Sequence, residues 1–266
     1  MKTKSALSYF GSDASVAADL ASLLDGCKHV TIPFVGGASI IPRLQANGIV
    51  ANDLNDLAIN FYRVLTKWEG EETRASLIDK CRATLSHPFN LTEALKGLES
   101  PDPAIKAWAY WATCWLARKG QGGTKSEGGG LSYRWRANGG SNASRIKSAA
   151  EGLCEWSASL TRCEWICESC FTLLGKVRDD GHCGVYCDPP WVSAGDVYKH
   201  RSTELDHFEL AQCLERFEKT RVVVRYGDHP LIRDLYKTWS IIEASSRTQA
   251  NSTIGEIWIT NFEVSK

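Results

Sequence analysis

The sequence lacks an excess of charge of either sign, because 31 lysine and arginine residues balance 31 aspartate and glutamate residues. This neutrality excludes a protein coated uniformly with positive charge for nucleic-acid binding, although it allows a local basic patch. Long apolar runs are lacking as well. The longest candidate, residues 107–117, is far shorter than the roughly 18 residues that a membrane helix needs, so we expect no membrane partner.

No export signal is recognisable. The segment MKTKSALSYF contains no apolar stretch followed by a small-residue cleavage site, so we expect a cytoplasmic protein. Thiols stay reduced there, and the ten cysteines are therefore interpreted as thiols. Cys163, Cys167 and Cys170 cluster in the spacing C-x3-C-x2-C, but no second cysteine or histidine pair lies at zinc-finger spacing. We expect buried thiols here and no metal site.

What the sequence does contain is an ordinary globular composition, with 43% apolar and 23% charged residues over 266 positions. This length suits one sizeable core, or one core with an inserted subdomain. Predicted strands and helices alternate in the first 65 residues and again in the last hundred, which favours an α/β fold with a doubly wound, mostly parallel sheet. The expected strands are 29–33, 49–52, 183–187, 221–226, 240–244 and 256–262, and the expected helices beside them are 14–24, 40–46, 54–65, 205–217 and 230–237.

The middle of the chain has a different character. Residues 71–117 are predicted to be all helical, with Ser100 as an N-cap before Pro101 at the first helical position. Residues 143–160 return to helical spacing.

Between these helical stretches, residues 118–147 are rich in glycine and hold seven lysine or arginine residues against a single glutamate. We therefore expect a helical and basic, Gly-rich insert over 66–144. The α/β domain would then be formed by two parts of the chain, 1–65 and 145–266.

The first feature with chemical content is the glycine-rich turn PFVGGAS, which follows a predicted strand. Glycines in this position let a ligand approach the backbone closely. The next predicted strand ends on Asp53, and an acid there accepts hydrogen bonds from both hydroxyls of a ribose. Folds that bind nicotinamide nucleotides or S-adenosylmethionine share this pair. Only two adjacent glycines are present, so a tight turn without a ligand stays an alternative.

The second feature is more specific. The sequence VYCDPPW places Asp188, Pro189, Pro190 and Trp191 at the carboxyl end of a predicted strand, where ligands bind in open α/β sheets. The two prolines have no N–H to donate and hold the backbone rigid. A carboxylate beside a fixed carbonyl provides two acceptors for an amino group, and the aromatic residue provides a flat face for a base. This combination indicates a site for an aromatic amine.

Together, TIPFVGGAS, VANDLNDLAINFYRVL and GVYCDPPW resemble the Dam-like class of DNA adenine N6-methyltransferases. Two further stretches are similar to the same class: ALSYFGSDASVA, in the place of its amino-terminal cofactor motif, and VVVRYGDHPLIRDLYKTW, in the place of its closing strand and helix. The similarity covers roughly residues 5–65 and 145–262. The region between matches only in its position as a target-recognition insert.

The resemblance implies a class I methyltransferase-like fold that binds S-adenosylmethionine and methylates the N6 amine of an adenine flipped out of double-stranded DNA. Carried over by position, the motifs place cofactor contacts and catalytic residues in this chain. The cofactor contacts are Tyr9, Gly11, Phe34, Gly36, Gly37, Asp53, Leu54 and Phe171, and the catalytic residues are Asp188, Pro189, Pro190 and Trp191.

Four positions depart from the family pattern. Asp13 stands where a lysine is usual, and Cys170 stands where an aspartate often touches the cofactor adenine. Ala38 takes the place of a third glycine, and an alanine is tolerated there on the condition that its φ is negative. Trp191 replaces the commoner tyrosine and keeps a stacking surface.

The basic Gly-rich segment then suits a DNA-contacting role. Lys125, Arg134 and Arg136 are expected to contact phosphates, and Trp135 is expected to read or wedge into the target site. A solvated loop without a DNA contact is the alternative.

Other functions remain open. The same chemistry on RNA adenine or on the N4 amine of cytosine is compatible with the acid–Pro–Pro–Trp motif. A nicotinamide oxidoreductase would use the glycine turn and Asp53 but leaves that motif unexplained. A DNA-binding relative without catalysis is the third alternative, which the departures at Asp13 and Cys170 favour.

Overall fold

The computed structural model describes residues 5–11, 14–118, 130–133, 141–192, 203–247 and 253–264. Contacts between residues divide the chain into two compact units. The first unit comprises Met1–Ala17, Gly36–Arg43 and Asn55–Cys167, and the second comprises Ala18–Val35, Leu44–Leu54 and Glu168–Lys266. The boundaries expected for the insert stay a prediction.

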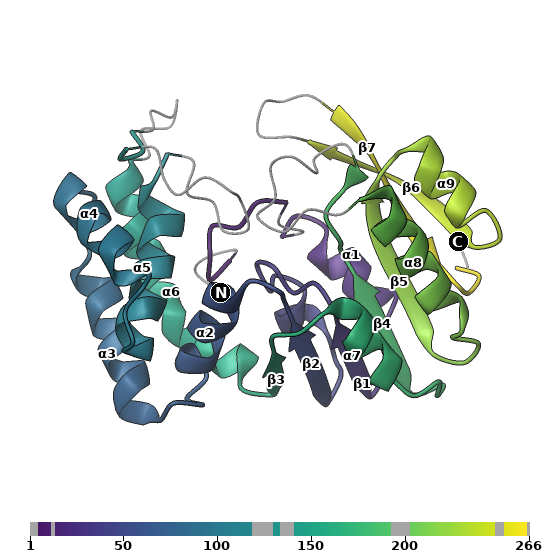
Figure 1. The fold of residues 1–266 in the computed structure, drawn as a ribbon, viewed down its shortest axis with the longest axis horizontal. Helices are drawn as coiled ribbons and strands as arrows, with labels where there is room; N and C mark the ends of the chain where they lie inside the picture. The colour runs from purple at the N-terminus through teal and green to yellow at the C-terminus, as the bar shows by residue number, and fades with distance from the viewer. Residues whose placement is uncertain are drawn as a thin grey trace. The chain divides into compact units, whose positions relative to one another are not determined.

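The fold is α/β, with a seven-stranded sheet in the order β3-β2-β1-β4-β5-β7-β6 (Figure 1). β1 runs parallel to β2 and β4, and β4 runs parallel to β5, whereas β7 is antiparallel to both β5 and β6. The sheet is thus mostly parallel, as predicted. Its strands are β1 (His29–Ile32), β2 (Gly48–Asn52), β3 (Cys163–Ile166), β4 (Cys183–Cys187), β5 (Arg221–Gly227), β6 (Ser240–Arg247) and β7 (Thr253–Thr260).

Nine α-helices lie within the described residues, and none of these is long and apolar enough to cross a bilayer. The helices are α1 (Ala17–Ser22), α2 (Asp56–Leu65), α3 (Glu71–Ala83), α4 (Pro88–Gly97), α5 (Pro103–Leu116), α6 (Asn142–Leu160), α7 (Cys170–Lys176), α8 (Glu204–Glu215) and α9 (Pro230–Leu235). The helix expected at 40–46 is wrong, since only the 3-10 turn η1 (Ile41–Arg43) forms. Directly after it, the N–H groups of Asn47 and Gly48 bond to the Lys28 carbonyl, which leads the chain into β2.

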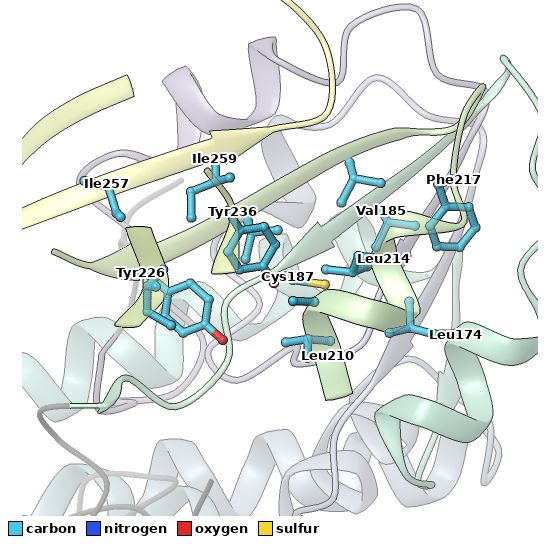
Figure 2. Close-up of a cluster of buried hydrophobic side chains, with 14 residues drawn as sticks. Leu174, Val185, Cys187, Leu210, Leu214, Phe217, Tyr226, Tyr236, Ile257 and Ile259 are labelled. Atoms are coloured by element: carbon cyan, nitrogen blue, oxygen red, sulfur yellow. The ribbon is translucent and has the colours of Figure 1, made fainter. Parts of the chain in front are cut away.

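A buried apolar cluster holds β4, β5 and β7 of the second unit against helices (Figure 2). Alternate residues of each strand point into it, as expected for a strand with a period of two. From β4 these are Val185 and Cys187, from β5 Val222, Val224 and Tyr226, and from β7 Ile257 and Ile259; α8 contributes Leu210, Ala211 and Leu214, and α7 contributes Leu174.

The opposite faces of these strands are buried as well. A Cβ added at Gly184 of β4 would lie 2.9 Å from Leu24 and 3.0 Å from the Cys27 sulfur, so the chain after α1 packs directly on this strand. On β5, Val223 and Arg225 point to this second face and are both buried. A strand covered on both sides explains the run of valines in RVVVRYG.

In the first unit, α5 is apolar around most of its circumference and is buried accordingly. Trp108 on α5 donates its indole N–H to the Thr84 hydroxyl at 2.8 Å, and the Asn55 amide donates to the Tyr110 hydroxyl at 2.8 Å. Tyr62 of α2 stacks on Trp165 of β3, with ring centroids 4.5 Å apart. The aromatic residues of this region are thus mainly packing elements.

The N-cap predicted for α5 is wrong by two residues. Asp102 caps the helix, because its carboxylate accepts from the N–H groups of Ala104 at 2.8 Å and Ile105 at 3.2 Å. Pro103, and not Pro101, occupies the first helical position. Ser100 instead accepts a hydrogen bond from the Asp102 N–H at 3.2 Å, so it supports the cap residue.

Asp102→Ala is expected to lower the free energy of unfolding by about 1 kcal/mol, because two N–H groups at the start of α5 lose their acceptor. Urea denaturation measures the change. Ser100→Ala is the matched control and is expected to cost less. An equal or larger loss for Ser100→Ala would contradict the cap assignment.

Candidate active site

Four parallel strands of the second unit end at one edge of the sheet. Their registers align β2 with β1, β1 with β4, and β4 with β5, so their carboxyl ends lie together. Chain order reverses between β1 and β4, and in open α/β sheets ligands bind at such a switch point. The sequence-predicted residues of this unit that follow these strands are Phe34 after β1, Asp53 and Leu54 after β2, and Asp188, Pro189, Pro190 and Trp191 after β4.

Asp188 is held by a buried arginine on the neighbouring strand. Its Oδ2 atom accepts from Nη1 of Arg225 at 2.9 Å. Arg225 also donates from Nε and Nη2 to the two carboxylate oxygens of Glu256 on β7, both at 2.9 Å. The side chains are 5% exposed for Arg225, 17% for Asp188 and 0% for Glu256, so this is an interior cluster of one cation and two acids.

The two carboxylates of this cluster stabilise the charged form of Arg225. Burial alone would lower the pKa of Arg225, but Asp188 and the hydrogen-bonded Glu256 outweigh it, and the pKa is raised well above its ordinary value. Arg225 therefore stays a cation at every accessible pH. Trp258 adds a further support by donating its indole N–H to Glu256 at 2.7 Å.

Trp191 lies against the end of β5. A Cβ added at Gly227 would come within 2.6 Å of the Trp191 ring, so the indole packs directly on a strand position that has no side chain. The guanidinium carbon of Arg225 is 5.1 Å from the Trp191 ring centroid, within cation–π range. One arginine thus contacts both the acid and the aromatic residue of the motif.

Asn52 ties together the loops at this edge. Its side-chain amide donates to the carbonyls of Pro33 at 2.9 Å and Glu168 at 3.0 Å, and its oxygen accepts from the Glu168 N–H at 3.0 Å. The N–H of Val35 donates to the Asn52 carbonyl at 2.7 Å. The chain after β1, after β2 and before α7 is therefore fixed by one buried residue, directly beside Asp53.

Aromatic side chains from two loops and from the start of α7 pack on the same apolar cluster. Phe34, Phe171 and Trp191 are each partly buried against it. Leu54, in contrast, is 48% exposed. The structure thus brings Phe34 and Phe171 to the cluster that also supports the acid–Pro–Pro–Trp loop.

In the first unit, Tyr9 and Gly36 meet. Gly36 has a φ of +47°, and an added Cβ would lie 3.2 Å from the Tyr9 ring, so a side chain there would have to displace the tyrosine. The Tyr62 hydroxyl donates to the Gly36 carbonyl at 2.9 Å. Gly37 is buried, and Gly11 is exposed with a φ of +72°.

Ala38 does not meet the condition of a negative φ, since its φ is +56°. The left-handed conformation costs an alanine about 1–2 kcal/mol relative to the right-handed one, so the turn retains a glycine-like backbone without the glycine.

The three cysteines of the C-x3-C-x2-C spacing differ in their exposure. Cys163 and Cys170 are buried while Cys167 is exposed, and burial raises the pKa of the Cys163 and Cys170 thiols to about 12. Such thiols stay protonated at neutral pH and are poor metal ligands. No group of three or more metal-binding side chains occurs in the part of the chain that the structure describes.

Lys125, Arg134, Trp135, Arg136 and Asp13 lie outside the described residues. Of the seven basic residues of segment 118–147, Arg118, Arg145 and Lys147 lie within the described residues, the last two on α6. The Arg118 N–H donates to the Gly130 carbonyl at 3.1 Å, and the Ser132 N–H donates to the Leu116 carbonyl at 2.8 Å. The two ends of residues 118–130 are therefore closed by a short antiparallel pairing, with Tyr133 next to it 70% exposed.

The sequence analysis missed Glu256, the buried partner of Arg225 on β7, and two further residues. Arg225 is an arginine inside an otherwise apolar strand, and Asn52 is a buried amide on the last position of β2. Both are polar residues on fully buried strand positions, and that contrast is a sequence signal for a structured interior contact.

No protein-family model matches the sequence, and no curated protein sequence matches it either.

Gly227→Ala is expected to lower the free energy of unfolding by about 1–3 kcal/mol, because the new methyl group overlaps the Trp191 ring. Urea denaturation followed by circular dichroism gives the value. Gly181→Ala is the control, since an added Cβ there meets nothing within 4 Å. If both variants unfold at the same urea concentration, Trp191 does not pack on β5.

Proposed function

We propose that this protein transfers a methyl group from S-adenosylmethionine to the N6 amine of adenine in DNA, as in the Dam-like class that its motifs resemble. One observation carries the proposal. The acid, two prolines and tryptophan leave β4 at the switch point of a mostly parallel sheet, with Asp188 held by Arg225 and Trp191 packed on Gly227. This sheet is compatible with the class I methyltransferase-like fold implied by the resemblance.

The cofactor residues present suit the proposed cofactor in most respects. Asp53 follows the second strand from the switch point, where an acid binds ribose hydroxyls. Within the first unit, Gly36 has a positive φ, and an added Cβ would lie only 3.2 Å from the Tyr9 ring, which is typical of a turn that a ligand approaches closely. Phe34 and Phe171 offer apolar surface for an adenine ring. Cys170 is buried and its pKa is raised to about 12, so its thiol is a much weaker acceptor than the usual aspartate and that contact would be weakened.

S-adenosylmethionine, when bound, supplies a methyl group already activated by its sulfonium. The protein residues then have a positioning task. An aromatic amine is a poor nucleophile because its lone pair is spread into the ring. The Asp188 carboxylate and the Pro189 carbonyl would accept its two hydrogens and stabilise the positive charge that develops on nitrogen. The N–CH3 bond would form as the S–CH3 bond breaks, the thioether product S-adenosylhomocysteine would leave, and one amine proton would pass to solvent. Alignment of this kind contributes on the order of 7–11 kcal/mol, and no covalent enzyme intermediate is needed.

The adenine must leave the duplex to reach this loop. Flipping costs a few kcal/mol. Stacking on the Trp191 indole would return about 1–3 kcal/mol. Because Trp191 is fixed by the strand beneath it, the base would meet a rigid surface that needs no reorganisation. The proposed DNA contacts of the insert rest on its sequence alone.

Asp188→Ala is expected to reduce methyl transfer to below a few per cent while leaving S-adenosylmethionine affinity within a few-fold, because Asp188 faces the amine. Rates are measured with tritiated cofactor, and affinity by calorimetry. Methylation-aware sequencing of a plasmid from cells that express the parent identifies the methylated base. If methyl groups are found on cytosine N4, or only on RNA, the proposed substrate is wrong and the proposed methyl transfer from S-adenosylmethionine is kept.

Asp53→Ala is the reciprocal variant. It is expected to weaken cofactor binding by about 1.5–3 kcal/mol, the range for a hydrogen bond to a charged group. If the dissociation constant for S-adenosylmethionine is unchanged, Asp53 does not bind the ribose of the cofactor. Binding of a nicotinamide nucleotide without S-adenosylmethionine would contradict the proposed function, and binding of neither would leave a non-catalytic DNA-binding protein.

A triple variant tests the insert. Changing Lys125, Arg134 and Arg136 to Ala is expected to lower the salt slope of DNA binding by about 0.9 per lost phosphate contact, nearly 3 in total. Fluorescence anisotropy at several salt concentrations measures the slope. The control, matched in charge, changes three exposed lysines outside the segment: Lys96, Lys176 and Lys237. Equal slopes for both variants would make the basic segment a bystander.

Trp135→Ala is the companion to this variant. It should reduce discrimination between the target and a one-base variant more than it reduces non-specific affinity.

A further inference from the structure

We infer that Arg225, fixed by Glu256, is a positioning residue that sets the orientation of both Asp188 and Trp191 for amine binding. The inference rests on the proposed function and assigns to it a residue outside the acid–Pro–Pro–Trp motif.

The burial of Arg225 is the first argument. A guanidinium with 5% exposure is strongly unfavourable unless its donors are paired, and a hydrophobic side chain of similar size would be at least as stable in such a position. Its neighbours on β5 are valines and a tyrosine. The stability of the packed strand therefore does not explain why an arginine occupies this position.

The second argument is directional. Two of the donors of Arg225 are bound to Glu256 in a fork, which fixes the plane of the guanidinium. Glu256 is completely buried and is itself held by the Trp258 indole. Nη1 therefore donates to Asp188 Oδ2 from a fixed direction. The Asp188 carboxylate is held by a series of hydrogen bonds that runs from Trp258 through Glu256 to Arg225.

The third argument is that the same guanidinium also lies 5.1 Å from the Trp191 ring. The ring is bounded by Gly227 on the strand below it. The acceptor and the stacking surface of the proposed site therefore share one support, and their relative geometry depends on a single planar group. A lysine cannot reproduce this arrangement, because its ammonium has no planar fork.

The test separates positioning from simple charge neutralisation. Arg225→Lys keeps the charge but loses the fork. It is expected to lower kcat by on the order of 100-fold, the effect of a small misplacement at a reacting centre, while KM for DNA and the cofactor dissociation constant change less than about threefold. Arg233→Lys is the matched control, because Arg233 pairs with Asp228 and Glu243 at an exposed site on α9. It should leave kcat unchanged.

A milder variant guards against loss of folding. Glu256→Gln keeps Arg225 and Asp188 in place but weakens the fork, and we expect a smaller fall in kcat, roughly tenfold, at a temperature where circular dichroism shows a folded protein. The double variant Asp188→Asn with Arg225→Lys completes a cycle. If Arg225 acts through Asp188, the second change costs far less in the Asp188→Asn background than in the parent.

The outcomes are distinct. A parent that neither binds S-adenosylmethionine nor methylates DNA overturns the proposed function, and this inference with it. An active parent whose Arg225→Lys and Glu256→Gln variants keep full kcat overturns the inference alone. Additive losses in the cycle, or equal losses in kcat and in cofactor binding, would also overturn it, since they describe a general structural role.

Discussion

A guanidinium buried between two carboxylates determines how the end of β4 meets the strands beside it. Arg225 could not occupy the interior alone, because an unpaired buried charge is destabilising by about 3–5 kcal/mol. Asp188 and Glu256 satisfy it from two different segments of the chain. The loop after β4 is thus connected to β5 and β7 by charge, in addition to the backbone ladder. The rigidity of the candidate site follows from this requirement.

The apolar cluster on the other face of the same strands makes the arrangement stable. Alternate residues of β5 lie on opposite faces of the strand. Val222, Val224 and Tyr226 pack toward the helices, while Arg225 and Gly227 face the candidate site. The period of two in a strand allows one segment to serve a core and a polar site together. Burial on the first face compensates for the cost of desolvating a charge on the second.

Most of the sheet could be predicted from the sequence, because β-branched runs such as RVVVRYG and HVTI carry a strong local signal. β3 and α7 were missed. They are short, with four and seven residues: CEWI has one β-branched residue, and the N-cap residue of α7, Ser169, makes no side-chain capping bond. The α5 cap was misplaced because SPDP contains two possible Pro-led starts, and only the three-dimensional bonds of Asp102 distinguish them.

For the candidate site too, some residues could be predicted from the sequence and others could not. Asp188 could be placed at the end of a strand, since the acid–Pro–Pro–Trp motif and the preceding apolar run are contiguous. Its partner could not be found in this way, because Arg225 and Glu256 are brought to it by strand pairing and not by sequence spacing. The backbone of Ala38 also escaped local inference. An alanine gives no hint of the left-handed conformation that the turn imposes on it.

Glu256 lies on β7, which pairs with β5 on one side and β6 on the other. During synthesis on the ribosome, Asp188 and Arg225 therefore emerge before the residue that fixes the guanidinium. The hairpin of β6 and β7 must be made, closed and docked on β5 before the three side chains can adopt their final arrangement. The geometry at the end of β4 is thus incomplete until β7, a strand far along the chain, has paired with β5.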